Sequence, residues 1–157
     1  MAVTLIRYVG ASPRAVWEAV TDFAAHADAV PLTSIRPEPG SPRPGWGFVA
    51  RTALGPARFD DPMRLTEWTP VPQDPRQPQR GAFTIVKEGR LLAGWARVSV
   101  EPATSERTCR LVWREQIDLA PLPILTRPRP LRRAVDLATA RLFDRAIDRF
   151  SAAARER

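Results

Sequence analysis

Six strand-like segments follow one another in the middle of the chain. They occupy residues 32–38, 46–54, 58–69, 82–89, 91–102 and 108–119, and turn residues or proline-rich loops separate each from the next. Strands that follow one another in this way pair as antiparallel neighbours, whereas parallel strands need long crossover connections. The pattern therefore predicts one antiparallel sheet, one face of which must be covered by other parts of the chain.

Helical patterns flank these strands. A β-rich segment at residues 2–9 is followed by a short helix, for which Ser12 is suited as the N-cap and Pro13 as the first residue. A second short helix is predicted at residues 23–30. Apolar residues then recur at i, i+3 and i+4 over residues 131–153, as in a long amphipathic helix.

A single long helix can cover the open face of a curved sheet. We therefore predict an α+β helix-grip fold, in which a curved antiparallel sheet of about seven strands wraps around the long C-terminal helix. Two short helices would follow the first strand. The length of 157 residues suits one domain, residues 1–157.

The composition indicates the class of protein and its expected cellular location. Hydrophobic residues make up 44% and charged residues 26%, which is typical of a globular protein. No apolar run approaches the roughly 20 residues of a membrane span, and the first ten residues do not resemble a signal peptide. The single cysteine, Cys109, excludes an internal disulfide, so a cytoplasmic location is expected.

The charge is strongly basic. The formal net charge is +7, yet Lys87 is the only lysine and all other basic residues are arginines scattered from Arg7 to Arg157. A basic excess raises the question of nucleic-acid binding, but no recognised nucleic-acid-binding motif is present. Arginine in place of lysine almost throughout is typical of a coding bias, so no specific nucleic-acid partner is expected.

Four segments carry a resemblance to a known superfamily. They are "SPRAVWEAVTDFAAHADAVPLT", "LGPARFDDPMRLTEWTP", "GRLLAGWARVSVEP" and "CRLVWREQIDL". In this order they resemble the START/Bet v 1-like (SRPBCC) superfamily, and within it the bacterial polyketide cyclase/dehydrase and lipid-transport group. The resemblance implies a seven-stranded sheet around a cavity that holds a hydrophobic small molecule. It carries over no catalytic residue, because the superfamily has no shared catalytic motif.

Glu115 is the leading candidate for a functional residue. In the last strand it alternates in phase with Cys109, Leu111 and Trp113, which are expected on the buried face. A buried carboxylate needs a partner, and Arg51 is a candidate if its side of the third strand faces inward. Glu115 could then form a structural ion pair, anchor a ligand, or act as a general acid or base with a raised pKa.

The stretch "DDPM" raises a second question. Asp61 shares the face of Phe59, Met63, Leu65 and Glu67, whereas Asp60 shares the opposite face with Arg64 and Trp68. Pro62 cannot donate a ladder hydrogen bond, so it is expected at an edge, a bend or a bulge. The favoured interpretation is that Asp60 and Asp61 pair with arginines or cap a turn. The alternative places one carboxylate at the mouth of a cavity.

The predicted function follows from these residues and from the resemblance. The expected ligand-binding residues are Arg51, Met63, Phe83, Trp113, Glu115 and Phe143. The only histidine, His26, cannot build a multi-histidine metal site, and it is expected at the surface or at the cavity entrance. No nucleotide-binding or nucleophile motif is present, so neither a metal nor a cofactor is expected.

We predict the binding of a polyketide-like or lipid molecule. If the protein is an enzyme, the reaction would be a cyclisation or a dehydration. The alternative is a non-catalytic carrier or a protein-interaction module with a filled cavity.

Overall fold

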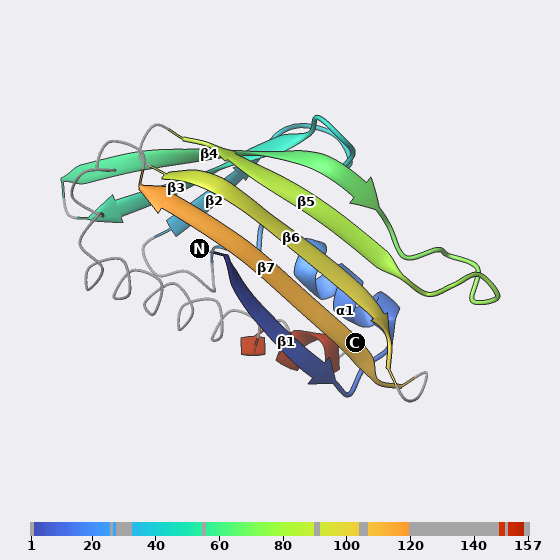
Figure 1. The fold of residues 1–157 in the computed structure, drawn as a ribbon. Helices are drawn as coiled ribbons and strands as arrows, with labels where there is room; N and C mark the ends of the chain where they lie inside the picture. The colour runs from blue at the N-terminus through green and yellow to red at the C-terminus, as the bar shows by residue number, and fades with distance from the viewer. Residues whose placement is uncertain are drawn as a thin grey trace.

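Seven strands form a single antiparallel sheet in the order β1-β7-β6-β5-β4-β3-β2 (Figure 1). The computed structural model describes residues 2–25, 27, 33–54, 56–89, 92–103, 107–119, 148–149 and 151–155. The elements are β1 Val3–Val9, α1 Pro13–Thr21, β2 Thr33–Pro37, β3 Gly47–Leu54, β4 Ala57–Thr69, β5 Gly81–Glu88, β6 Leu92–Pro102 and β7 Cys109–Leu119. The predicted seven-stranded antiparallel sheet is thereby confirmed.

The two other predicted helices fall largely outside the described residues. Of the C-terminal helix, residues 148–149 and 151–155 are described and are helical, whereas Phe143 lies outside this part. Of the second short helix, 23–30, residues 23–25 form a turn and residue 27 is helical, whereas the other four, His26 among them, lie outside the described residues. No helix within the described ranges is both long and apolar enough to cross a membrane.

The helix α1 forms as its sequence predicts. The Ser12 side chain accepts a hydrogen bond from the Ala15 amide at 3.2 Å, and Pro13 occupies the first helical position. The buried side of α1, which includes Val16 and Val20, packs on the sheet face that bends over the helix (Figure 1). This packing places α1 at one end of the inward face of the sheet.

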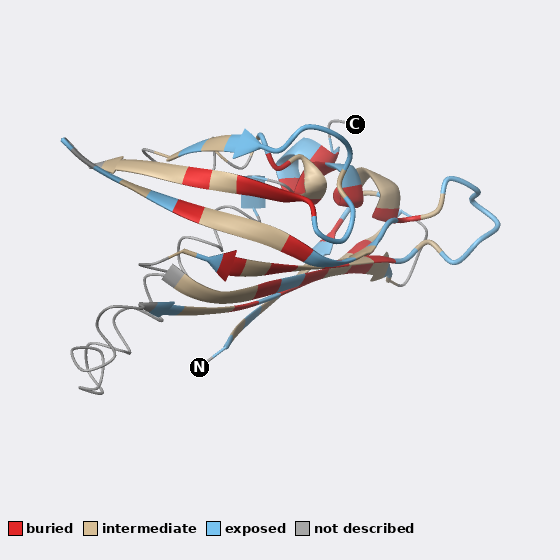
Figure 2. Cartoon of the chain, turned by 90° about the horizontal axis from the view of Figure 1, so that it is seen from above, coloured by how far each residue is buried: buried red, intermediate tan, exposed pale blue. Residues whose placement is uncertain are grey.

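An aromatic cluster joins α1 to the sheet and forms much of the core. Its members are Trp17, Phe23, Trp46, Phe48, Trp68 and Phe83. The ring centroids of Phe23 and Phe48 lie 5.0 Å apart, as do those of Trp17 and Trp68. Such contacts contribute about 0.5–1.5 kcal/mol each beyond the area they bury. Buried residues occur on α1 and along the strands (Figure 2), and most of the buried apolar ones belong to the same core as this cluster.

The strand β4 departs from the simple alternation expected from its sequence. The register with β5 shifts between Leu65 and Glu67, and beyond the shift Trp68 pairs with Phe83. Trp68 therefore turns toward the core and Glu67 is exposed, so the predicted faces of these two residues were wrong. An inserted residue reverses the alternation of every residue that follows it.

Pro62 lies at a local edge, as predicted. It is opposite Val49 of β3, but the pairing of β4 with β5 begins only at the next residue, Met63. The missing amide hydrogen of proline therefore falls where β4 has a partner strand on one side only. The register shift of β4 lies further along the strand, between Leu65 and Glu67, and not at Pro62.

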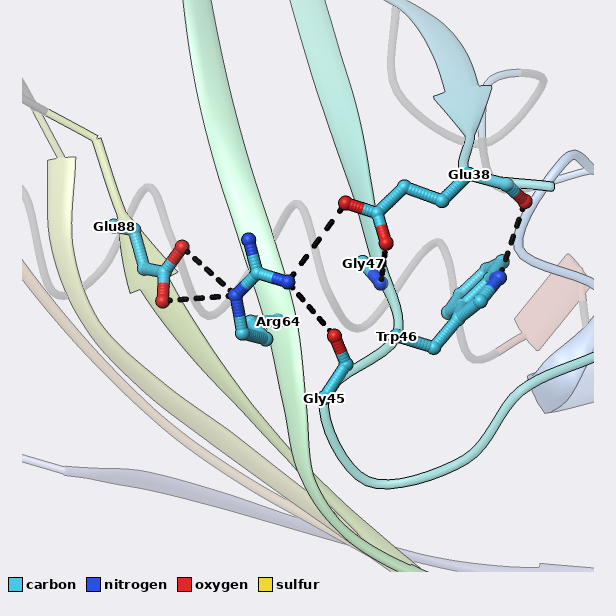
Figure 3. A network of polar contacts seen from close by, with 6 residues as sticks. All are labelled: Glu38, Gly45, Trp46, Gly47, Arg64 and Glu88. Atoms are coloured by element: carbon cyan, nitrogen blue, oxygen red, sulfur yellow. Dashed lines mark hydrogen bonds and ion pairs between the residues drawn. The ribbon is translucent and has the colours of Figure 1, made fainter. Parts of the chain in front are cut away.

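Arg64 ties the loop between β2 and β3 to the outer side of the sheet (Figure 3). Its guanidinium donates to the Gly45 carbonyl at 2.7 Å and to the Glu88 carboxylate at 3.2 Å, and it lies 3.7 Å from Glu38. The Glu38 carbonyl in turn accepts a hydrogen bond from the Trp46 indole at 3.1 Å. These contacts hold the loop between β2 and β3 in place, so that the Trp46 ring packs in the aromatic cluster.

Candidate functional site: a buried charge cluster

Three charged side chains meet on the inward face of the sheet, where apolar residues would be expected. Asp61 of β4, Lys87 of β5 and Glu115 of β7 are exposed by only 4%, 9% and 3%. Lys87 Nζ lies 3.1 Å from Asp61 Oδ2 and 3.7 Å from Glu115 Oε1. We call these three residues the charge cluster. Charged residues are rarely buried unless they are paired, so the cluster marks an unusual site in the core.

The register of the sheet explains how Lys87 reaches both carboxylates. On β6, which separates β5 from β7, Gly94 lies opposite Lys87, and Ala96 lies opposite Glu115. These two small residues leave room for the long lysine side chain to extend across β6. Asp61 lies on the other side of Lys87, two residues before Met63, which is the β4 partner of Lys87.

Gly94 is itself required by the backbone. Its φ of +134° lies in a region that other residues rarely adopt, and an added Cβ would lie only 2.0 Å from the Gln116 carbonyl oxygen. The close approach of β6 and β7 therefore requires glycine at position 94, and this glycine leaves room for the Lys87 side chain.

Glu115 can exchange a proton near neutral pH. Burial raises the pKa of this carboxyl to about 7, although the charge of Lys87 and a hydrogen bond from Trp113 oppose the rise. The Trp113 indole donates to Glu115 Oε2 at 3.0 Å. A group with this pKa is present in both protonation states under physiological conditions, as a general acid or base must be.

Asp61 differs from Glu115 in its hydrogen bonding. Burial raises the pKa of the Asp61 carboxyl, and the adjacent charge of Lys87 lowers it in part. Lys87 donates to Oδ2, but the buried Oδ1 atom accepts no hydrogen bond from any residue that the structure describes. Lys87 also lies 3.9 Å from the Met63 sulfur.

The expected partner of Glu115 was wrong. Arg51 binds Asp60 through two hydrogen bonds of 2.6 and 2.7 Å at a partly exposed position. The pairing of β3 with β4 sets these residues opposite each other, and the buried side chains of Phe48 and Ala50 lie on the other face of β3. Arg51 therefore lies on the outward side and cannot serve Glu115.

The two acids of "DDPM" have different environments. Asp60 pairs with an arginine at the surface, as the favoured interpretation predicted. Asp61 is buried against Lys87, so that interpretation was wrong for Asp61. The pKa of Asp60 is lowered by its hydrogen bond to Arg51, the reverse of the direction found for Asp61.

The remaining predicted residues divide into two groups. Met63 and Glu115 lie beside Lys87, and Trp113 donates a hydrogen bond to Glu115. Phe83 is fully buried in the aromatic cluster. Roles of these residues in ligand binding stay predictions.

Lys87 is the residue that the sequence reasoning missed. Two signals could have revealed it. It is the only lysine in an arginine-rich chain, and it alternates in phase with the buried Phe83 and Ile85. A charged residue that continues an inward-facing series needs a buried partner of opposite charge.

A reactive cysteine and a metal site find little support in the described part of the chain. Cys109 is fully buried, and burial raises the pKa of its thiol to about 11, as in an unreactive core cysteine. Among the described residues, no group of three or more histidine, cysteine, aspartate and glutamate side chains is arranged to hold a metal ion.

Comparison with known proteins identifies the family. Residues 2–155 match the family model described as polyketide cyclase / dehydrase and lipid transport. The chain belongs to this family. Its predicted membership of the START/Bet v 1-like (SRPBCC) superfamily is thereby confirmed. A comparison with curated protein sequences gives no match.

Solved structures of the superfamily share the fold at low sequence identity. The ZhuI aromatase/cyclase from Streptomyces sp. R1128 aligns with a TM-score of 0.68 at 14% identity, over 100% of this chain and 94% of that one. A START superfamily protein from Mycobacterium smegmatis gives 0.64 at 15% identity, over 93% of each chain. Ara h 8.0201 gives 0.61 at 12% identity, over 97% and 98%. At these identities the likeness shows the fold alone.

Proposed function

We propose that this protein binds a hydrophobic small molecule, polyketide-like or lipid, in an internal cavity against the inward face of the sheet, and that Glu115 exchanges protons with it. Family membership supports a hydrophobic ligand. The observation that carries the chemical part is the position of Glu115, buried among apolar residues, with Trp113 and Lys87 beside it.

The charge cluster suits the dehydration of a β-hydroxy ketone. The Glu115 carboxylate takes a proton from the carbon between the carbonyl and the hydroxyl-bearing carbon, and the resulting enolate oxygen is stabilised by the Lys87 ammonium. The protonated Glu115 then returns the proton to the hydroxyl group. The carbon–oxygen bond breaks, a carbon–carbon double bond forms, water leaves and Glu115 is again a carboxylate. The same proton exchange serves an aldol-type cyclisation.

A simple β-hydroxy ketone tests this proposal. Wild-type protein is incubated with 4-hydroxy-4-phenylbutan-2-one, and the ultraviolet absorbance of the conjugated product 4-phenylbut-3-en-2-one is followed. We expect Glu115→Gln to lower the rate by about 10²–10⁴-fold, because the amide cannot carry the proton. Asp60→Asn is the matched control, since Asp60 is a surface acid paired with Arg51. Equal rates for the wild type and Glu115→Gln would show that Glu115 does not transfer the proton in this reaction.

A second candidate is a non-catalytic carrier or a protein-interaction module with a filled cavity. The aromatic cluster favours this alternative, because its six rings fill the end of the inward face next to α1. Binding of the β-hydroxy ketone without turnover, measured by calorimetry, would point to a carrier. Absence of both binding and turnover would favour the interaction module.

A further inference from the structure

One carboxyl oxygen of Asp61, Oδ1, has no hydrogen-bond donor among the described residues. The Asp61 Oδ2 atom accepts a hydrogen bond from Lys87 at 3.1 Å, whereas Oδ1 is buried and meets no donor within the described ranges. A buried polar atom without a partner destabilises the folded state, and such atoms are uncommon in folded proteins. The Asp61 side chain as a whole is only 5% exposed, so bulk water does not satisfy this oxygen.

We propose that Asp61 Oδ1 accepts a hydrogen bond from a hydroxyl group of the ligand, which makes Asp61 the residue that selects hydroxylated over purely apolar ligands. This inference rests on the proposed function, because it assigns the polar contact of the same ligand. It assigns to Asp61 a role different from that of Glu115, since Asp61 binds and Glu115 exchanges protons.

The charges around Asp61 favour a neutral donor over a charged one. A ligand ammonium would be repelled by the Lys87 ammonium, which lies within 4 Å of both carboxylates of the charge cluster. A ligand carboxylate has no hydrogen to donate to Oδ1 and would be repelled by the Asp61 carboxylate. A hydroxyl group carries the needed hydrogen without a charge.

The neighbours of Asp61 suit an apolar body next to that hydroxyl. Met63 is half-buried and lies two residues along β4, with its sulfur 3.9 Å from Lys87. Leu65 and Ile85, which pair across β4 and β5, continue the same inward face and are buried. A flat aromatic ring that bears a hydroxyl group matches this combination, because thioether groups pack well against rings.

Two probes that differ in a single group test the inference. The affinities of 2-naphthol and 2-methoxynaphthalene for the wild-type protein are measured by isothermal titration calorimetry. The two share the ring system, but only the naphthol can donate a hydrogen bond. We expect 2-naphthol to bind at least about 10-fold more tightly, because a hydrogen bond to a charged group is stronger than one between neutral groups.

The Asp61→Asn variant isolates the atom concerned. The Lys87 ammonium requires an acceptor, so the amide oxygen of Asn would face it and the amide nitrogen would take the place of Oδ1. The amide nitrogen, a donor, would then face the naphthol hydroxyl in place of the acceptor Oδ1. The 10-fold preference for 2-naphthol should therefore disappear. Asp60→Asn is again the control and should keep the preference, since Asp60 pairs with Arg51.

Each outcome separates this inference from the proposed function. Equal affinity of both probes for the wild type would overturn the inference and leave hydrophobic binding intact. A preference that survives in Asp61→Asn would also overturn it, and so would tighter binding of 2-naphthylmethylamine. If neither naphthalene bound at millimolar concentration, the inference and the proposed function would both be overturned. If the variant fails to fold, equal affinity of the two probes for the wild type still overturns the inference.

Discussion

The ammonium of Lys87 lies 3.1 Å from the Asp61 carboxylate, and both side chains are more than nine-tenths buried. Glu115 joins them from a third strand at 3.7 Å. Every other basic residue of the chain is an arginine. A lysine at this position provides a compact, single-point charge at the end of a slim chain, whereas the wide guanidinium of arginine needs more space.

Removal of Lys87 should destabilise the protein strongly. In Lys87→Met the two carboxylates of the charge cluster lose their cation, and breaking a buried ion pair in this way costs about 3–5 kcal/mol. The free energy of unfolding is measured by urea denaturation at pH 8. Arg51→Met is the control and should change the free energy of unfolding far less, because its pair with Asp60 is partly exposed and screened by solvent. Equal losses in the two variants would contradict the buried character of the cluster.

Glu115 should make the stability depend on pH. Its pKa rises from 4.5 to about 7 on folding, so between these values the folded state binds more protons than the unfolded state. The free energy of unfolding should therefore fall as the pH rises through this window, by about 3 kcal/mol in total. Urea denaturation of the wild type and of Glu115→Gln at several pH values checks this. The difference between the two should change across the window and level off above about pH 7, and a constant difference would refute the assignment.

Gly94 should not tolerate a side chain. A Cβ at this position would lie 2.0 Å from the Gln116 carbonyl oxygen, and the φ of +134° is strained for alanine. We expect Gly94→Ala to lower the free energy of unfolding by about 2 kcal/mol or more. Gly10→Ala is the matched control, because a Cβ there has no neighbour within 4 Å. Thermal denaturation of both variants provides the measurement, and similar melting temperatures would argue against the close approach of β6 and β7.

The positive charge should not produce specific DNA binding. The net charge of +7 can attract phosphates, but a contact made through phosphates alone weakens steeply as salt is added. Fluorescence anisotropy with a labelled duplex should show weak binding at low salt and almost none at physiological salt. Sequence-selective binding below micromolar concentration at physiological salt would show that the arginines form a recognition surface.

The alternation of side chains along each strand is what the sequence determined. Residues of a strand point to opposite faces in turn, so Trp113 and Glu115 could be placed on the buried face from local order alone. The N-cap at Ser12 and the edge position of Pro62 likewise depend on a few neighbouring residues. These features depend on residues close together in the chain, so they can be predicted from the sequence.

The partners of the buried charges were decided only by the tertiary structure. A strand can slide by two residues against its neighbour without changing which side chains face the core, so alternation cannot reveal which residues meet. The register of β3 with β4 assigned Arg51 to Asp60, and the registers of β4 to β7 brought Asp61, Lys87 and Glu115 together. Registers are fixed by the packing of the whole sheet and by irregularities such as the shift between Leu65 and Glu67. The charge cluster therefore depends on contacts between residues far apart in the chain, which no local pattern encodes.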